Sequence, residues 1–143
     1  MLETLKIQKE RLINADPKTV WFVLTNPEEI KKWLGVEAQS EWKPGSDILF
    51  TFNWDGKAYA DKGKVIRFDD EKSFVYSYWS GFSGLPDDPE NYSKIKFLLE
   101  PTNGGVILKL THSEFATETM YQHSDKNWEG TLDEIKKLSE EKV

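Results

Sequence analysis

The sequence predicts an α+β fold in which a curved antiparallel sheet wraps around one long C-terminal helix. Between residues 47 and 113, apolar and polar residues alternate in several runs, which is the pattern of half-buried strands. Turn sequences separate the runs, and Asp55-Gly56 is the strongest hairpin signal among them. After the last run, four apolar residues form one helical stripe: Trp128, Leu132, Ile135 and Leu138. Such a stripe has to be buried, and the sheet is its only large apolar partner.

The N-terminal segment predicts one strand followed by two short helices. Residues 5–14 begin with strand-like alternation. Asp16-Pro17 and Asn26-Pro27 each combine a capping residue with a first-turn proline, so each is expected to open a helix. Gly35 suits the exit of the second helix. The two helices, broken at Asn26-Pro27, are expected to form a V at one end of the sheet.

Five or six antiparallel strands are expected after these helices. The predicted strands and connections follow in order: residues 48–54, 57–68, 74–79, a long loop at 80–91, 95–99, 106–113, and a connection at 115–123. Ser124 is the candidate N-cap of the final helix. The inner face of the sheet is expected to carry the large apolar residues of these strands: Phe50, Phe52, Trp54, Tyr76, Tyr78, Phe97, Leu99, Leu108 and Leu110.

Length, charge and composition restrict the class of protein. Residues 1–143 are expected to form one domain. The absence of cysteine excludes disulfides and thiolate metal sites. A net charge of −6 with interspersed signs argues against a nucleic-acid partner. No run approaches the roughly 18 apolar residues of a membrane span, and charged residues interrupt the N-terminus, so membrane insertion is not expected and the interpretation is a cytoplasmic protein.

The aromatic residues suggest a ligand cavity between the sheet and the final helix. Rings make up 13% of the chain, which favours either a cavity lined by rings or a closely packed core. Both alternatives need the same alternating pattern, so the sequence leaves them open. The candidate ligand-binding residues are Phe50, Phe52, Trp54, Tyr76, Tyr78, Phe97, Leu99, Leu110, His112, Trp128 and Leu132.

Three other features carry hypotheses of their own. The 80–91 loop, with Phe82 and Leu85, is either a lid over the cavity or a surface loop. His112 either orients a ligand or is a hydrogen-bonded structural histidine. The polar face of the final helix is either solvated or a docking surface for a basic partner. The sequence has no phosphate-binding loop, dinucleotide motif or nucleophile elbow, so neither a cofactor, a metal nor a catalytic residue is predicted.

Short motifs spread along the chain resemble the START-like helix-grip superfamily. Within it, the chain is similar to proteins related to the C-terminal domain of the activator of the heat-shock protein 90 ATPase. The matching residues are Ile13-Asn14-Ala15-Asp16-Pro17, Val20-Trp21, Leu24-Thr25-Asn26-Pro27, Trp33, Pro44-Gly45, Asp55-Gly56, Gly63, Val65, Tyr76 to Trp79, Gly104-Gly105, Leu108, Leu110-Thr111-His112-Ser113, Trp128, Leu132 and Leu138. The family commonly has glycine before the helix tryptophan, where this chain has Asn127, and glycine where it has Ser46.

The resemblance implies a helix-grip fold and a range of functions, because its members include small-molecule carriers, chaperone activators and a few enzymes. The leading hypothesis is a non-enzymatic binding protein for a hydrophobic or aromatic small molecule. A protein-interaction module that regulates a chaperone ATPase is the alternative, and an enzyme acting on a small hydrophobic substrate comes third. A monomer or a weak homodimer fits the short edge strands.

Overall fold

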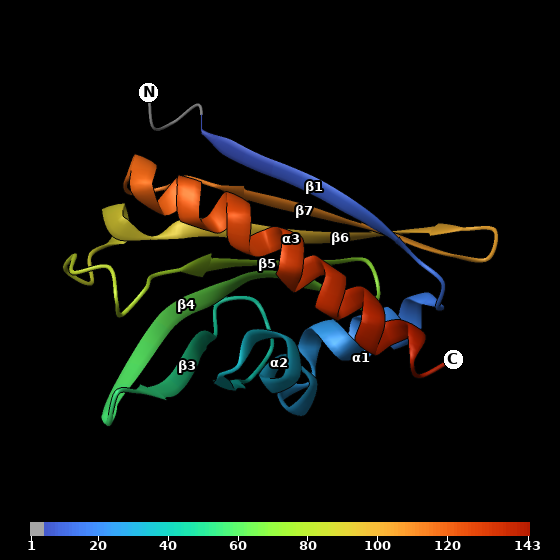
Figure 1. Ribbon diagram of the computed structural model, residues 1–143, viewed down its shortest axis with the longest axis horizontal. Helices are drawn as coiled ribbons and strands as arrows, with labels where there is room; N and C mark the ends of the chain where they lie inside the picture. The colour runs from blue at the N-terminus through green and yellow to red at the C-terminus, as the bar shows by residue number, and fades with distance from the viewer. Residues whose placement is uncertain (1–4) are drawn as a thin grey trace.

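The computed structural model describes residues 5–143, so residues 1–4 of the predicted domain lie outside the described residues. Within that range, seven strands form one antiparallel sheet in the order β1-β7-β6-β5-β4-β3-β2 (Figure 1). The strands are β1 (Lys6–Ile13), β2 (Glu37–Ser40), β3 (Asp47–Trp54), β4 (Lys57–Asp69), β5 (Ser73–Tyr78), β6 (Ser93–Thr102) and β7 (Gly105–Ser113). The helices are α1 (Pro17–Thr25), α2 (Pro27–Leu34) and α3 (Glu118–Glu140), and Pro89–Asn91 forms the 3-10 turn η2.

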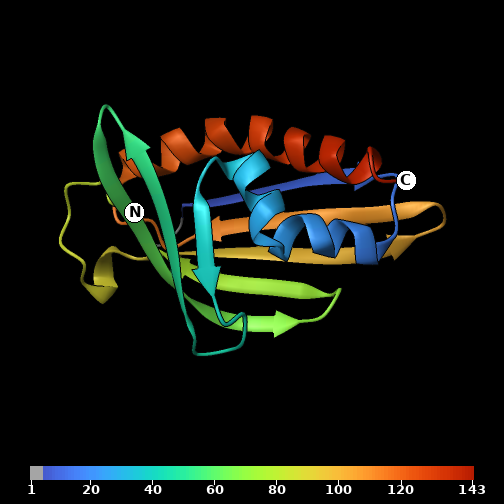
Figure 2. The ribbon, with the colours of Figure 1, turned by 90° about the horizontal axis from the view of Figure 1, so that it is seen from below.

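The helices lie together on the concave side of the sheet, with α3 running along β1 and α1 packing beneath its C-terminal half (Figures 1 and 2). The β3–β4 hairpin curls up at the end of the molecule away from α1 (Figure 2). This arrangement confirms the predicted fold class. The two short helices and the β3–β4 hairpin, which no helix covers, lie at opposite ends of the molecule. No helix within residues 5–143 is long and apolar enough to cross a membrane.

Local capping explains the two short helices. The Asp16 carboxylate accepts a hydrogen bond from the Thr19 amide at 2.8 Å, and the Asn26 side chain accepts one from the Glu28 amide at 3.0 Å. Gly35 ends α2 in the left-handed conformation, with φ of 77°. All three boundaries were expected from the sequence and are confirmed.

The Asp55-Gly56 turn sets the register of β3 against β4. Both residues have positive φ, 51° and 76°, which is the conformation that two-residue hairpins favour. Phe52 therefore faces Tyr59, and Phe50 faces Asp61. The short strand β2 was not predicted, because Glu37–Ser40 has no apolar alternation and is held by its pairing with β3.

The final helix begins seven residues earlier than expected, so the candidate cap Ser124 is wrong. The helix starts at Glu118, and the Thr117 hydroxyl caps it by accepting a hydrogen bond from the Met120 amide at 3.1 Å. Tyr121 lies two turns before Trp128 on the same stripe and packs against the core. Polar residues at 124 and 125 interrupt the stripe in the sequence, which hides one continuous helix of 23 residues.

Candidate functional site

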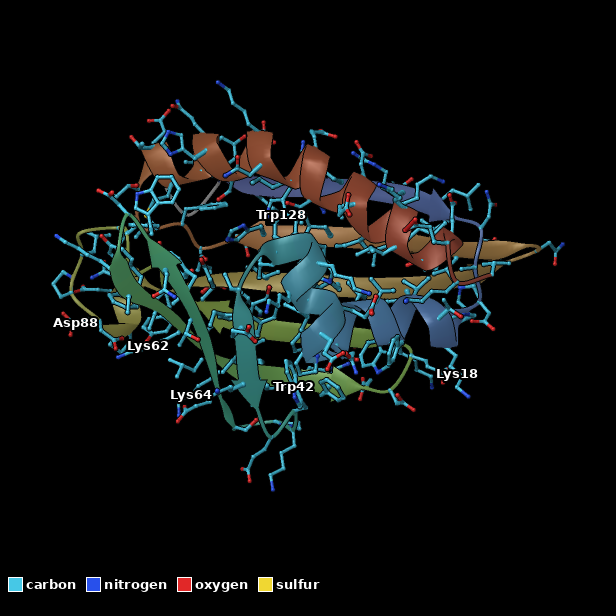
Figure 3. All side chains as sticks on the ribbon, turned by 60° about the horizontal axis from the view of Figure 1, so that its bottom comes forward. Lys18, Trp42, Lys62, Lys64, Asp88 and Trp128 are labelled. Carbon is cyan, nitrogen blue, oxygen red and sulfur yellow. The ribbon has the colours of Figure 1, made fainter. Side chains whose placement is uncertain are left out.

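The space between α3 and the middle of the sheet is filled by side chains. Trp128, which is labelled in Figure 3, is 8% exposed. Its ring meets that of Phe97 edge-on, with 5.8 Å between ring centroids. Leu132 from α3 is fully buried, as is Phe97 from β6. Five of the predicted ligand-binding residues thus pack here against one another or their neighbours: Phe97, Leu99, Leu110, Trp128 and Leu132. The pockets described for residues 5–143 open elsewhere, and Trp128 lines none of them.

His112 is held inside this packing by two hydrogen bonds. Its Nδ1 accepts the indole N–H of Trp128 at 3.0 Å, so the ring proton sits on Nε2 and is donated to the Ser93 hydroxyl at 2.8 Å. Burial lowers the pKa of His112 to about 3. A neutral imidazole with both nitrogens occupied is a structural group, which is the second of the two interpretations that the sequence left open for it.

A buried carboxylate lies on the concave face toward the β3–β4 hairpin. Asp61 is 7% exposed; one of its oxygens accepts the Tyr78 hydroxyl and the other accepts the Gly81 amide at 2.7 Å. Burial raises the pKa of Asp61, although both hydrogen bonds act against that shift. Asp61 therefore ties strand β4 to strand β5 and to the start of the long loop.

Tyr76 lies one step further inside the sheet and differs from Tyr78 in its hydrogen bonding. Its ring is 3% exposed, stacks on Phe74 at 4.8 Å and contacts Phe50 at 6.1 Å. Burial alone raises the pKa of Tyr76, and no hydrogen bond from residues 5–143 reaches its hydroxyl. Phe50 also contacts Tyr78 at 6.0 Å, so it bridges the two tyrosines.

Four rings at the open end of the concave face form an aromatic rim, which consists of Phe52, Trp54, Tyr59 and Phe82. Phe52 and Tyr59 stack at 5.7 Å with an angle of 19°, and Phe82 covers Tyr59 at 4.3 Å. Trp54 is 64% exposed and Phe82 is 52% exposed. Trp54 lies on the same face as Phe50 and Phe52, as predicted, but it stays exposed because the hairpin carries it beyond the last layer of the core. A hollow of about 380 Å³ borders the same hairpin, but most of its lining residues alternate with Phe52 and Tyr59 along the strands and so lie on the convex face: Thr51, Asn53, Ala58 and Ala60.

The long loop is divided into a fixed part and a short tip. On the convex side, Asp87 pairs with Lys62 at 3.0 Å and accepts the Tyr92 hydroxyl, and the Trp79 indole donates to the Pro86 carbonyl at 3.1 Å. Leu85, predicted as a lid residue, is half-buried beside this anchor. Only the tip around Phe82 reaches the concave side, so the lid predicted over residues 80–91 is reduced to that tip.

The contacts of Asp87 with Lys62 and Tyr92 border a groove on the convex side of the sheet. This groove has a volume of about 750 Å³. Its lining residues include Leu49, Lys62, Lys64, Ser77, Pro89 and Tyr92. Its two lysines are already paired with Asp87 and Asp47. A bound anion would therefore compete with existing ion pairs.

The polar face of α3 is partly used inside the molecule. Arg11 of β1 pairs with Asp133 at 2.9 Å, and Lys9 pairs with Asp125 at 3.1 Å. Lys136 donates to the Leu12 carbonyl at 2.6 Å. This face clamps α3 to the edge strand β1, a role that neither sequence alternative, a solvated face or a docking surface, had included.

Comparison with known protein families identifies the family of this chain. Residues 14–140 match the family described as "Activator of Hsp90 ATPase homolog 1-like protein". The chain belongs to this family. The fold of this activator-like family suggests a ligand-binding or co-chaperone-like domain. No functionally curated protein matches the sequence.

Solved structures of similar chains agree with the family assignment. The solution structure of ChR145 from Cytophaga hutchinsonii is 40% identical, covers 100% of this chain and 99% of its own, and has a TM-score of 0.85. MLL2253 from Mesorhizobium loti is 23% identical over 93% of this chain and 95% of its own, with a TM-score of 0.77. The Aha1 dimer from Colwellia psychrerythraea is 23% identical over 96% and 97%, with a TM-score of 0.75. The last two comparisons concern the fold alone.

Sequence reasoning missed two members of this activator-like domain's open end, Tyr59 and Asp61. The signal was present in the hairpin, because a two-residue turn at Asp55-Gly56 fixes every opposite pair along β3 and β4. Counting outward from the turn places Tyr59 opposite Phe52 and Asp61 opposite Phe50. Both positions then fall on the concave face next to residues that were predicted there.

Proposed function

We propose that this protein is a cytoplasmic, non-enzymatic binding protein that takes a hydrophobic or aromatic small molecule at the aromatic rim. The observation that carries this proposal is the exposure of the rim's rings on the concave side of a binding-type fold, while the rings under α3 are closely packed. The binding region is therefore displaced from the Trp128 helix toward the β3–β4 hairpin.

Exposed aromatic groups that touch one another support a binding role. Contiguous apolar surface is uncommon on monomeric soluble proteins and marks interaction sites. Phe82 sits on a short tip, and its ring lies over Phe52 and Tyr59. Its movement is the simplest way to open the rim to a flat ligand.

Two buried titratable groups, His112 under α3 and Asp61 near the rim, support binding without turnover. His112 has both ring nitrogens engaged, and burial keeps it neutral. Each oxygen of Asp61 accepts one hydrogen bond within the fold. Neither group is free to act as a general base in the arrangement that the structure describes.

Titration with aromatic and hydrophobic metabolites, followed by tryptophan fluorescence, tests the proposal. Trp54 belongs to the rim and reports binding there. Saturable quenching is expected, and Phe82→Ala should raise the Kd by about tenfold or more, because it removes a ring from the contact surface. Ile66→Ala is the matched control, since Ile66 is also exposed and apolar but lies outside the rim. A flat response across the whole panel, or equal effects of the two substitutions, contradicts the proposal.

A second candidate, regulation of a chaperone ATPase, is favoured by the family match over residues 14–140. The aromatic rim is then a protein-docking surface, for which exposed tryptophan and phenylalanine are also suited. Stimulation of a purified heat-shock protein 90 ATPase from the same source, lost in Phe82→Ala, supports this candidate. Unchanged ATPase turnover at a saturating concentration of this protein excludes it.

A further inference from the structure

We propose that the groove on the convex side of the sheet is a second binding site, which takes an organic anion made of a carboxylate attached to an apolar body. This site lies on the opposite face of the sheet from the aromatic rim and does not depend on the proposed function. Three donor groups support it: the ammonium groups of Lys64 and Lys94 and the hydroxyl of Ser77.

The strand register brings these three side chains together. Lys64, labelled in Figure 3, belongs to β4, Ser77 to β5 and Lys94 to β6, which are adjacent strands. The Lys64 amide donates to the Ser77 hydroxyl oxygen at 3.0 Å, and Ser77 lies directly opposite Lys94. Because their neighbours Tyr76 and Ile95 are buried in the concave core, Ser77 and Lys94 point to the convex side.

Gly63 allows β4 to approach β5 closely enough for this contact. A Cβ atom at position 63 would lie 1.9 Å from the carbonyl oxygen of Ser77, so a larger residue would push the two strands apart. A few residues further along, the pairing of β4 with β5 shifts register between Val65 and Arg67. Gly63 is itself among the residues that line the groove, so the groove lies beside this irregular pairing.

The three groups offer more hydrogen-bond donors than their neighbours accept. The Ser77 oxygen accepts the Lys64 amide, but within residues 5–143 no group accepts the proton of its hydroxyl. In the same part of the chain, Lys94 forms no ion pair. Lys64 has one carboxylate partner there, Asp47, at 3.3 Å. A surface with such an excess of donors fits a ligand group that only accepts, and an ionised carboxylate is such a group.

The two carboxylates that line the groove differ in how firmly they are held. Asp87 uses both oxygens, one for the Tyr92 hydroxyl and one for Lys62 at 3.0 Å, and these two partners lower its pKa. The side chain of Asp47 is 82% exposed and that of its partner Lys64 is 65% exposed, and an ion pair so exposed contributes little stability. A ligand carboxylate can therefore displace Asp47 from Lys64, while Asp87 stays on Lys62.

The rest of the lining offers apolar surface for the body of the ligand. Leu49 of β3 and Tyr92 are half-buried, and Pro89 of η2 lies at the same groove. Pro89 and Tyr92 belong to the part of the long loop that Asp87 holds in place, so this wall exists before a ligand binds. The volume of about 750 Å³ lies within the range of roughly 300–1,000 Å³ that small-molecule sites occupy.

Three probes that share a phenylbutyl body test the preference for an anion at neutral pH. Phenylbutanoate is anionic, phenylbutanol is neutral and phenylbutylamine is cationic. Titration of the isotopically labelled full chain, followed by amide chemical shifts, measures each Kd and locates the site in the same spectra. Shifts at Lys64, Ser77 and Lys94 report the groove, and shifts at Trp54 and Phe82 report the aromatic rim.

The anion is expected to bind the groove at least about fivefold more tightly than the alcohol, because its carboxylate accepts charge-assisted hydrogen bonds. The amine should bind most weakly of the three. A higher salt concentration should weaken the binding of the anion and leave that of the alcohol unchanged. Equal affinity of the groove for the anion and the alcohol overturns the preference for an anion.

Removal of one cation should weaken the anion alone. Lys94→Gln is expected to raise the Kd of phenylbutanoate about threefold and to leave that of phenylbutanol unchanged. Lys109→Gln is the matched control, because Lys109 also lies on the convex face but pairs with Glu100 outside the groove. Equal effects of the two substitutions overturn the role of Lys94.

Removal of the competing carboxylate should have the opposite sign. Asp47→Asn frees Lys64 and is expected to lower the Kd of phenylbutanoate about threefold. Asp70→Asn changes the net charge equally but lies in the turn after β4, so it should leave the Kd unchanged. An unaltered Kd in Asp47→Asn overturns the displacement of Asp47 by the ligand.

The position of the shift changes separates this inference from the proposed function. Saturable changes at Lys64, Ser77 and Lys94 support the groove as a site, whether or not the rim also responds. Changes confined to Trp54 and Phe82 support the proposed function and overturn this inference. The absence of saturable changes at the groove with phenylbutanoate overturns it as well.

Discussion

The packed interior under α3 and the aromatic rim are built from the same kinds of residue with opposite exposure. Trp128 is 8% exposed and Phe97 is fully buried, whereas Trp54 is 64% exposed and Phe82 is 52% exposed. In the interior, α3 provides a second layer over the sheet, and each polar atom of the tryptophan–histidine pair has a hydrogen-bond partner, with Ser93 of β6 bonded to Nε2 of His112. At the rim, the rings touch one another but no helix covers them. Aromatic content by itself therefore does not locate a binding site; the missing second layer does.

The largest expected effect is that of Trp128→Ala on the packed interior. The substitution removes a buried ring and leaves the Nδ1 atom of His112 without its donor, so the free energy of unfolding should fall by about 3–5 kcal/mol. Urea denaturation followed by circular dichroism measures this loss. Trp54→Ala is the matched control at the rim, and a comparable loss there would remove the distinction between the two regions.

The pH dependence of stability should depend on His112. Its pKa is lowered from 6.5 to about 3 in the folded state, so between these values the unfolded chain binds a proton that the folded protein does not. The contribution is fully present above pH 6.5 and is lost at about 1.4 kcal/mol per pH unit as the pH falls toward 3.

A non-titrating replacement isolates this effect. His112→Gln should be less stable at neutral pH but show a flatter stability profile between pH 7 and 4, measured by urea denaturation at each pH. His123 is exposed, so His123→Gln should reproduce the profile of the unaltered protein. A profile that is equally steep in His112→Gln would place the titrating group elsewhere.

At the boundary between the two regions, Tyr78→Phe should produce an intermediate effect. The change removes the hydroxyl from Asp61 and keeps the ring that packs on Phe50, so the expected loss is about 1–2 kcal/mol. Hydrogen exchange of the Gly81 amide, which bonds to the same carboxylate, should become faster. Unchanged exchange at Gly81 would show that Asp61 does not link the strand to the loop. Tyr92→Phe serves as a control, because its hydroxyl bonds to Asp87 on the convex side.

The smallest effect on stability is expected for Phe82→Ala. Half of the ring is already exposed, so the free energy of unfolding should change by less than about 1 kcal/mol. The same variant carries the largest effect on binding, so thermal denaturation and ligand titration of one sample compare the two properties directly. A large drop in Tm would mean that the rim belongs to the core and not to a binding surface.

Most boundaries of the fold could be predicted because they depend on local chemistry. The caps Asp16 and Asn26, the turn Asp55-Gly56 and the alternation of β3 each act within a few residues, and each was confirmed. The start of α3 could not be predicted, because Met120 and Tyr121 are held by packing on the core while Ser124 interrupts the stripe. The strand β2 likewise exists because β3 pairs with it.

The candidate site, like the fold, could be predicted from the sequence only in part. The sequence by itself determined the family, the α+β fold and which face of each strand carries the rings, because periodicity and short turns are local properties. Only the tertiary structure decided that Trp128 and His112 satisfy each other inside a packed core, and that Trp54 and Phe82 stay exposed. The physical reason is that a ring is buried when a second layer reaches it, and how far α3 extends over the curved sheet depends on contacts between residues distant in the chain.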